Sequence, residues 1–211
     1  MSVKDFVQQR RDALIAMRRD FHMYPEPAWL EYRSAAKVAD RLISLGYDVA
    51  LGADVLDLES RMGLPSDEVM KAAMDRAIKE GANPELVEKM GYGKTAIVAT
   101  MKFGGEGPVV AFRVDMDSND VIEAKEDSHV PTKEGFRSCH DKAMHACGHD
   151  AHMTMGLGLA EYLAAHKDEF KGTIKLIFQP AEEGVRGAKA MAEAGVVAVS
   201  YTHLRAHETL S

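Results

Sequence analysis

The sequence predicts an α/β fold in which helical layers cover the faces of a sheet. Two observations support this prediction. Apolar residues recur at helical spacing in several segments, and short runs rich in apolar and β-branched residues, typical of buried strands, lie between those segments. With 211 residues, the chain is long enough to bury a hydrophobic core.

Two helices are expected in the first quarter of the chain. The first runs from Val3 to about Phe21, and Pro25 and Pro27 prevent it from continuing. The second runs from about Glu31 to Leu45, and Gly46 follows it as a C-terminal cap. Both have apolar residues on one face, as expected for helices that pack against a core.

A charged, methionine-rich stretch, about residues 54–90, follows a short extended piece from Tyr47 to Leu51. Its pattern predicts helix, with Ser66 as an N-cap and Gly81 as a stop. We interpret this stretch as a helical excursion from the main fold. Its methionines are expected to fill the core: Met70, Met74 and Met90.

The second half of the chain alternates strands with helices. Strands are expected at Ala96–Phe103, Val109–Val114 and Thr173–Phe178, the first two joined across a glycine-rich turn. Helices are expected at Ala151–His166 and Gly187–Ala194, and the stretch before the first of them is irregular and polar. The residues of that first helix expected to point inward are Met155, Leu159, Tyr162 and Leu163.

The composition excludes several classes of protein. The 33 Asp and Glu residues outnumber the 26 Lys and Arg residues, which argues against a nucleic-acid surface because phosphate binding needs clustered cations. No apolar run approaches the ~20 residues that span a bilayer, and the N-terminus lacks a signal-peptide core. Two cysteines, Cys139 and Cys147, are too few for a disulfide scaffold. We therefore expect a cytoplasmic protein with no nucleic-acid or membrane partner.

The most informative motif combines His145, Cys147, His149, Asp150 and His152 at the start of an expected helix. These are the side chains that bind Zn²⁺-like ions. An ordinary helix start, with Asp150 as its cap and the histidines solvated, is the alternative. So many potential ligands within one turn favour a metal site.

Two adjacent glutamates, Glu182 and Glu183, come directly after the strand expected at Thr173–Phe178. Carboxylates at the C-terminal end of a strand lie where α/β folds place their sites. One can bind a metal while the other accepts a proton from a water molecule. A solvated acidic turn is the alternative. The histidine-cysteine motif favours the metal interpretation, since a hydrolytic site needs both ligands and a base.

A third pair of carboxylates, Asp115 and Asp117, lies at the end of the strand expected at Val109–Val114. These residues could ligate a metal or orient a ligating histidine, and a polar turn that ends the strand explains them equally well. For His22 and Glu26, nothing in the spacing demands chemistry, because a histidine near a helix C-terminus is usually structural.

Together these motifs resemble the M20 metallopeptidase superfamily, in the branch of aminoacylases, hippurate hydrolases and auxin-conjugate hydrolases. Further residues, at 60–65, 112–117 and 128–139, are similar to the subgroup that cleaves p-aminobenzoyl-glutamate. The resemblance spans about Val7 to Val197. The motifs that carry it are Arg18-Arg19-x-x-His22-x-x-Pro25-Glu26, Asp115-Met116-Asp117, His145-Ala-Cys147-Gly-His149-Asp150-x-His152 and Pro180-Ala-Glu182-Glu183-Gly184.

The resemblance implies a three-layer zinc-peptidase-like catalytic domain, of which residues 1–198 form the N-terminal part without the lid and dimerisation domain. Residues 199–211 resemble a translated sequencing adapter, so we expect a non-native tail and do not count His203 and His207 as ligands. The parent protein is expected to form a homodimer or a heterodimer with a related subunit, and the chain alone is expected to be inactive. One departure from the branch is Asp117-Ser-Asn-Asp120, where most members have Asp-Ala-Leu-Pro.

By the same resemblance, Cys147, His149 and Glu183 are metal ligands, Glu182 is the general base and Asp117 is a supporting catalytic carboxylate. The implied cofactors are two divalent ions, Mn²⁺ or Zn²⁺, and the implied reaction is hydrolysis of a small N-acyl amino acid. Two alternatives stay open: an exopeptidase or N-acetyl amino acid deacetylase of the same superfamily, and a non-catalytic metal-binding fragment. The paired glutamates argue against the second, because closed structural zinc sites use four Cys or His ligands.

Overall fold

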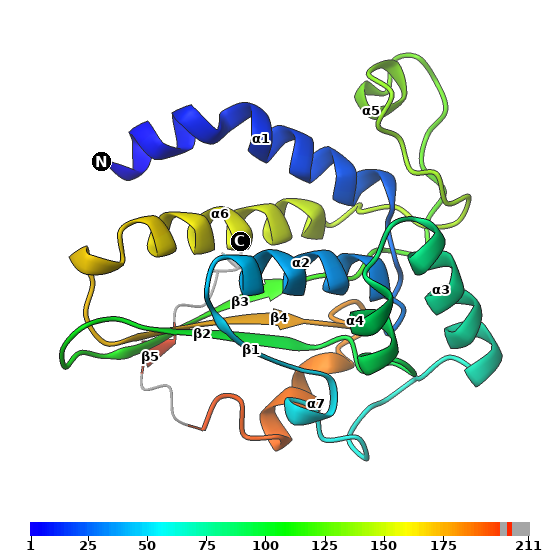
Figure 1. The fold of residues 1–211 in the computed structure, drawn as a ribbon. Coiled ribbons are helices and arrows are strands. Elements are labelled where there is room, and N and C mark those ends of the chain that lie inside the picture. Colours follow the sequence, from blue (N-terminus) through cyan, green and yellow to red (C-terminus); the bar gives the residue numbers. More distant parts are fainter. Residues whose placement is uncertain (199–201, 204–211) are drawn as a thin grey trace, which may run out of the picture.

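The structure, a computed structural model, describes residues 1–198 and the backbone of Thr202 and His203. Apart from those two residues, the expected tail at 199–211 lies outside the described residues. The strands are β1 (Asp48–Leu51), β2 (Ile97–Lys102), β3 (Val109–Asp115), β4 (Thr173–Gln179) and β5 (Thr202–His203). They form a mixed sheet in the order β1-β2-β4-β3-β5, in which β3 is parallel to its two neighbours (Figure 1).

The two strands on either side of the glycine-rich turn are not neighbours, because β4 lies between them. The connecting loop, residues 104–108, therefore crosses the start of β4. There the Phe103 amide donates to the Gly172 carbonyl, and the Thr173 amide donates to the Pro108 carbonyl. Gly172 has φ +83°, and a Cβ at this position would lie 2.3 Å from the Pro108 oxygen. Only glycine fits this crossing.

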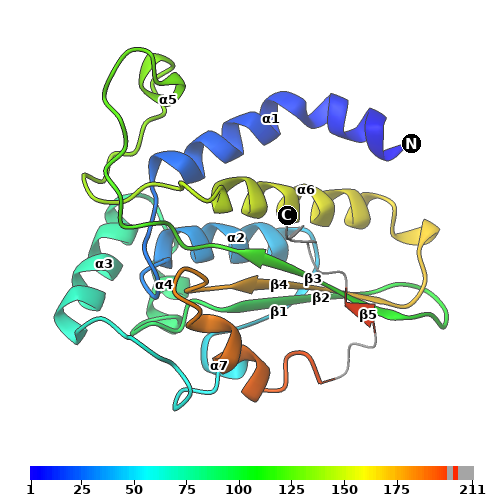
Figure 2. The same ribbon diagram turned by 180° about the vertical axis from the view of Figure 1, so that it is seen from behind.

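Helices cover both faces of the sheet. On one face lie α2 (Tyr32–Ser44) and α6 (His149–Ala165), with α1 (Val3–Met23) along the outer side of α6. Helix α7 (Gly187–Glu193) lies on the opposite face of the sheet, as the view of the molecule from behind shows (Figure 2). Alternate strand residues belong to two separate cores, so the predicted α/β fold with helical layers on both faces is confirmed. Short elements complete the chain: 3-10 turns at Gly52–Asp54 and Lys167–Glu169, and α5 (Val130–Lys133).

The excursion contains two helices, α3 (Asp67–Lys79) and α4 (Pro84–Lys89), and the stretch before α3 has no α-helix. The predicted N-cap is confirmed, since the Ser66 hydroxyl accepts a hydrogen bond from the Val69 amide. Gly81 follows α3 with φ +89°. The methionines pack as predicted: Met70 and Met90 are buried, and Met74 lies against the core. Both views place α3 and α4 at the end of the molecule toward which β3 and β4 point (Figures 1 and 2).

The orientation predicted for Met155 is wrong. Its side chain is 63% exposed, whereas Met153 and Leu157 are buried against the sheet. Two residues along a helix correspond to a rotation of ~200°, so Met155 points away from the face that Met153 presents. Met155 instead lines an apolar cavity of about 800 Å³ between α1 and α6.

Candidate metal centre

The predicted site residues come from three loops that meet at one end of the sheet. β3 and β4 are adjacent and parallel, and Asp115 pairs with Gln179 in the last register position. The loops that follow these strands therefore leave the same edge of the sheet. The third loop leads into α6, which packs on β3. The structure brings all five predicted residues to this edge: Asp117, Cys147, His149, Glu182 and Glu183.

Asp117 is fully buried and contacts two of the three loops. Its two carboxylate oxygens accept hydrogen bonds from the amides of Glu182 and Glu183, each at 2.9 Å. Its carbonyl oxygen lies 2.7 Å from Nδ1 of His149. Because that nitrogen must donate to the carbonyl, Nε2 of His149 is the nitrogen that can bind a metal ion once it has lost its proton. This geometry favours an orienting role for Asp117 over a ligating one.

The paired glutamates face the free nitrogen of His149. Nε2 lies 3.7 Å from a carboxylate oxygen of Glu182 and 4.0 Å from one of Glu183. These three side chains form a group whose ligand atoms all lie within 4.8 Å of one another. Oε1 of Glu183 is buried without a hydrogen-bond partner among the described residues. Imidazole and carboxylate donors suit Zn²⁺ and Mn²⁺, so the residues present fit a divalent ion.

Cys147 is held beside this group by the loop that departs from the family pattern. Asn119 accepts a hydrogen bond from the Cys147 amide at 3.1 Å, and its side-chain nitrogen lies 3.6 Å from the sulfur. The backbone of Asn119 also pairs with Met144, which ties together the loops after β3 and before α6. A hydrogen bond with Glu183 raises the pKa of the Cys147 thiol. The residues that replace the usual Ala-Leu-Pro thus still position the predicted sulfur ligand.

A second group of potential ligands overlaps the first. Asp115, His149 and His152 have ligand atoms within 4.8 Å of one another. Oδ2 of Asp115 lies 3.3 Å from Nδ1 of His152, and Oδ1 is buried without a partner among the described residues. The two imidazole rings stack with their centroids 5.1 Å apart. Sharing of His149 by two groups is compatible with a site for more than one ion.

The alternative of a helix start capped by Asp150, with solvated histidines, is wrong for the cap and for His145 and His149, whereas the side chain of His152 is 40% exposed. Gly148, with φ +83°, is the N-cap of α6, and Asp150 is fully buried in its first turn. His145 and His149 are only 3% and 4% exposed. The carboxylate of Asp150 instead pairs with Nδ1 of His22 at 2.8 Å. Burying polar or charged groups such as these costs free energy unless hydrogen-bond partners or ligands compensate it.

His22 has a larger structural role than its helix-end position indicates. It is buried, and its second nitrogen contacts Glu123 at 2.9 Å. Burial lowers the pKa of His22, but hydrogen bonds with Asp150 and Glu123 outweigh this and raise it. Glu123 also contacts His129 at 2.8 Å. Because His22 contacts both Glu123 and Asp150, it connects the irregular segment after β3 with the first turn of α6.

Sequence reasoning missed Glu31, which supports the glutamate loop. Its carboxylate is fully buried and accepts hydrogen bonds from the Ala181 amide at 2.8 Å and the Thr95 hydroxyl at 2.6 Å. Ala181 has φ +51°, an uncommon conformation for a residue other than glycine. Burial, reinforced by the charge of Asp117, raises the pKa of Glu31 to about 8. A glutamate at an expected helix start is too common to have indicated this role.

The ionisation of His149 and Glu31 predicts how the metal-free chain responds to pH. Burial lowers the pKa of His149, but hydrogen bonds with Asp117 outweigh it and raise the value to about 9. The resulting stabilisation is complete below the ordinary pKa of about 6.5 and is lost as the pH rises to about 9. The raised pKa of Glu31 acts in the same direction, because between about pH 4.5 and 8 the unfolded chain has released a proton that the buried carboxyl group of the folded chain still holds.

We therefore expect the denaturant concentration at the unfolding midpoint of the metal-free chain to decrease as the pH rises from about 6.5 to 9. His149→Gln should flatten the upper part of this profile. We also expect Zn²⁺ binding below pH ~9 to release protons, which calorimetry in buffers of different ionisation enthalpy measures. A midpoint that rises over this range would contradict the proposed protonation of His149.

The α/β fold gathers side chains that fit a divalent metal ion at one edge of its sheet. Residues 111–208 match the model of peptidase family M20/M25/M40, and the chain belongs to this family. It is 49% identical to one of the subunits of p-aminobenzoyl-glutamate hydrolase of Escherichia coli (strain K12), over 93% of this chain and 45% of the relative. It is 48% identical to indole-3-acetyl-aspartic acid hydrolase of Enterobacter agglomerans, over 92% of this chain and 45% of the relative.

Solved structures agree with this assignment. An aminobenzoyl-glutamate utilization protein from Klebsiella pneumoniae has a TM-score of 0.79 and 41% identity, covering 95% of this chain and 44% of its own. A dinuclear metal-binding peptidase of the M20 family from Bacillus subtilis has a TM-score of 0.66 and 28% identity, covering 95% and 42%. The chain thus spans about half the length of the relatives it matches.

Proposed function

We propose that the chain is part of a metal-dependent amidohydrolase that cleaves the amide bond of an N-acyl amino acid such as p-aminobenzoyl-glutamate. The observation that carries this proposal is the arrangement around His149, whose free nitrogen faces both Glu182 and Glu183. A ligand and a base placed side by side are what metal-assisted hydrolysis needs. The names of two relatives specify conjugates of acidic amino acids, which supports this substrate class.

Each predicted site residue has a part in this proposal. Cys147, His149 and Glu183 would hold two divalent ions, Mn²⁺ or Zn²⁺. When bound, such ions polarise an amide carbonyl and acidify a water molecule. Glu182 accepts the proton of the attacking water and delivers it to the departing amine. Burial, followed by the charge of Asp115, raises the pKa of Glu182, which favours proton uptake by this carboxylate.

An exopeptidase is the second candidate, because the chain is 36% identical to thermostable carboxypeptidase 1 of Saccharolobus solfataricus over 92% of its length. A non-catalytic metal site is less well supported. The carboxylate of Glu182 lies beside the ligand set, where a structural zinc site would need no base.

Assembly and location complete the proposal. The Escherichia coli relative is named as one component of a hydrolase with more than one kind of chain, which supports assembly as a homodimer or with a related partner. Cys139 and Cys147 are free thiols, which supports a cytoplasmic location. Within the described part of the chain, none of the helices is long and apolar enough to cross a membrane.

The test is an assay of p-aminobenzoyl-glutamate, an N-acetyl amino acid and a dipeptide after loading with Mn²⁺ or Zn²⁺. The assay uses this chain and a longer protein that adds the segments its relatives have beyond the matched region. A read of the source DNA across codon 198 tests whether the reading frame encodes such segments. We expect chelator-sensitive release of p-aminobenzoate by the longer protein. Faster cleavage of the dipeptide would favour the exopeptidase, and metal-loaded protein that cleaves no amide would refute the proposal.

A further inference from the structure

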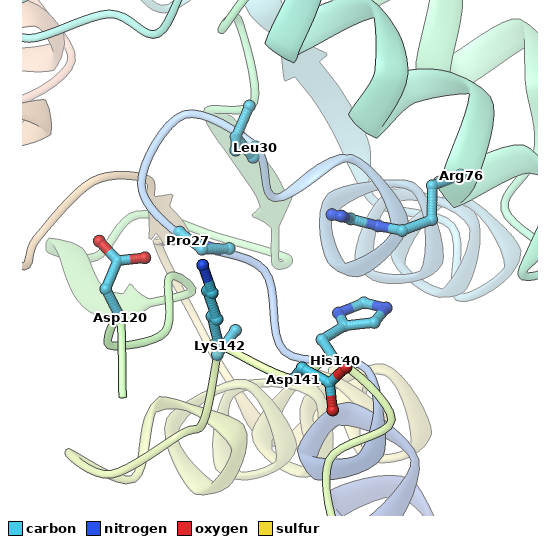
Figure 3. Close-up of a pocket in the computed structure, with 8 residues that line it drawn as sticks. Pro27, Leu30, Arg76, Asp120, His140, Asp141 and Lys142 are labelled. Carbon is cyan, nitrogen blue, oxygen red and sulfur yellow. The ribbon is translucent and has the colours of Figure 1, made fainter. Parts of the chain in front are cut away.

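A cavity of about 360 Å³ lies between α3 and the loops that follow β3 and precede α6, and Figure 3 shows the residues that line it. Its volume lies within the range of ~300–1,000 Å³ typical of small-molecule sites. One of its walls comes from α3, part of the excursion to which the proposed function assigns no role. The cavity is lined by Pro27, Leu30, Arg76, Asp120, His140, Asp141, Lys142 and Ala143.

The cavity and the metal centre share two chain segments. Asp120 follows Asn119, the residue that holds the amide of Cys147. Ala143 precedes Met144, whose backbone pairs with that of Asn119. A small molecule bound at the metal centre would therefore have the cavity as a neighbouring compartment.

Arg76 is the unusual member of this lining. Two of its guanidinium nitrogens, Nε and Nη2, are buried and have no hydrogen-bond partner among the described residues. Arg33 offers a contrast, because both of its terminal nitrogens bind the carboxylate of Asp20 and its guanidinium lies 3.9 Å from the ring of Tyr24. The buried carboxylate of Glu26 is a neighbouring negative charge, but its oxygens accept hydrogen bonds from the amides of Arg33 and Ser34. The two buried N–H groups of Arg76 therefore remain available to a further acceptor, because buried donors without a partner are costly.

Two cationic side chains of the lining, Arg76 and Lys142, are available to bind an anion in the cavity. Figure 3 shows the Arg76 guanidinium and the Lys142 amine approaching the cavity from different sides, with the carboxylate of Asp141 directed away. Both nitrogens of His140 are already used, by the Pro25 carbonyl at 2.7 Å and by Glu80 at 2.8 Å. Asp120 also lines the cavity and disfavours a multiply charged anion such as phosphate.

We propose that this cavity binds the side-chain carboxylate of an acidic N-acyl amino acid, with Arg76 and Lys142 as its cationic partners. The inference rests on the proposed function and specifies its substrate class. A guanidinium matches a carboxylate with two parallel hydrogen bonds, which gives both affinity and selectivity. Helix α3 thereby acts as a specificity element, since it carries Arg76 to the wall of the cavity.

The test measures binding to the metal-free chain by calorimetry, so it does not depend on hydrolysis. The probes are N-benzoyl-glutamate and N-benzoyl-glutamine, which differ in one charge. We expect the glutamate compound to bind about tenfold more tightly. Arg76→Met should abolish this preference and Lys142→Met should reduce it. Lys79→Met, which removes an exposed charge from the same helix, should leave it unchanged.

Two results would overturn the inference: equal affinities of the wild-type chain for both probes, or the same behaviour of Arg76→Met and Lys79→Met. If Arg76→Met fails to fold, Arg76→Lys serves instead, because it keeps the charge but loses the two parallel hydrogen bonds. Competition with glutarate tests whether the carboxylate bound in the cavity belongs to the N-acyl amino acid or to a separate molecule. We expect glutarate to compete with N-benzoyl-glutamate, whereas simultaneous binding of both would assign the cavity to a separate molecule. If the metal-loaded protein hydrolyses no amide but still prefers N-benzoyl-glutamate to N-benzoyl-glutamine, only the proposed function is refuted.

Discussion

Glu182→Gln is expected to lower kcat of the longer, metal-loaded protein by about 10²–10⁴-fold, the usual contribution of a general base. Glutamine preserves the size of the side chain but cannot accept the proton of water. The amide of residue 182 would still donate to Asp117, so the loop should keep its conformation. Steady-state kinetics with p-aminobenzoyl-glutamate, together with metal content after dialysis, measures both effects.

The neighbouring residue supplies the matched comparison. Glu183→Gln should release metal, because Glu183 is the predicted ligand, and its activity should recover in part at high metal concentration. Glu193→Gln, an exposed position on α7, should change neither property. The division of roles between the two glutamates would be wrong if Glu182→Gln lost metal while Glu183→Gln kept it.

Asp117→Ala is expected to weaken metal binding by about 10–100-fold, because it removes the carboxylate that holds the backbone of the predicted ligand Glu183. The backbone carbonyl that contacts His149 remains in this variant. The carboxylate of Asp117 accepts the amides of Glu182 and Glu183, so both would lose a partner in a partly buried loop. Each unsatisfied amide costs about 1–3 kcal/mol of stability, at the lower end here because water reaches the loop. Calorimetric titration with Zn²⁺ and chemical denaturation measure the two effects separately.

Asp117→Asn separates charge from hydrogen bonding, because asparagine keeps one acceptor oxygen and the volume of the side chain. We expect it to retain more stability than Asp117→Ala while still lowering metal affinity. Asp127→Ala, at an exposed position, controls for the loss of one negative charge. Unchanged metal affinity in Asp117→Ala would show that the loop of Glu182 and Glu183 keeps its position without this carboxylate.

Local patterns predicted most of the secondary structure. The second helix and the strand at Val109–Val114 were expected within a residue or two of their observed limits. Hydrophobic periodicity and caps act over one or two turns, so they can be read from neighbouring residues. The inward orientation expected for Met155 was wrong because the direction of the sheet relative to α6 is not a local property.

The sequence identified some residues of the candidate site, and only the structure showed the others. The residue types and spacing of the His145–His152 motif and of the Glu182-Glu183 pair identified side chains that the structure brings to one edge of the sheet. Their catalytic and metal-binding roles stay predictions. Glu31 and Arg76 had no comparable signal, because each is distant in sequence from the loops it supports or faces.

The sequence by itself thus determined the α/β class, most element limits and the chemical type of the site, since all three depend on local periodicity or on residue identity. Only the tertiary structure decided that β4 separates β2 from β3, which makes the ends of β3 and β4 adjacent. It alone showed that a buried carboxylate at Asp117 holds the backbone of both glutamates. The physical reason is that strand order and burial depend on contacts between distant segments, whose closure entropy and packing no short sequence window records.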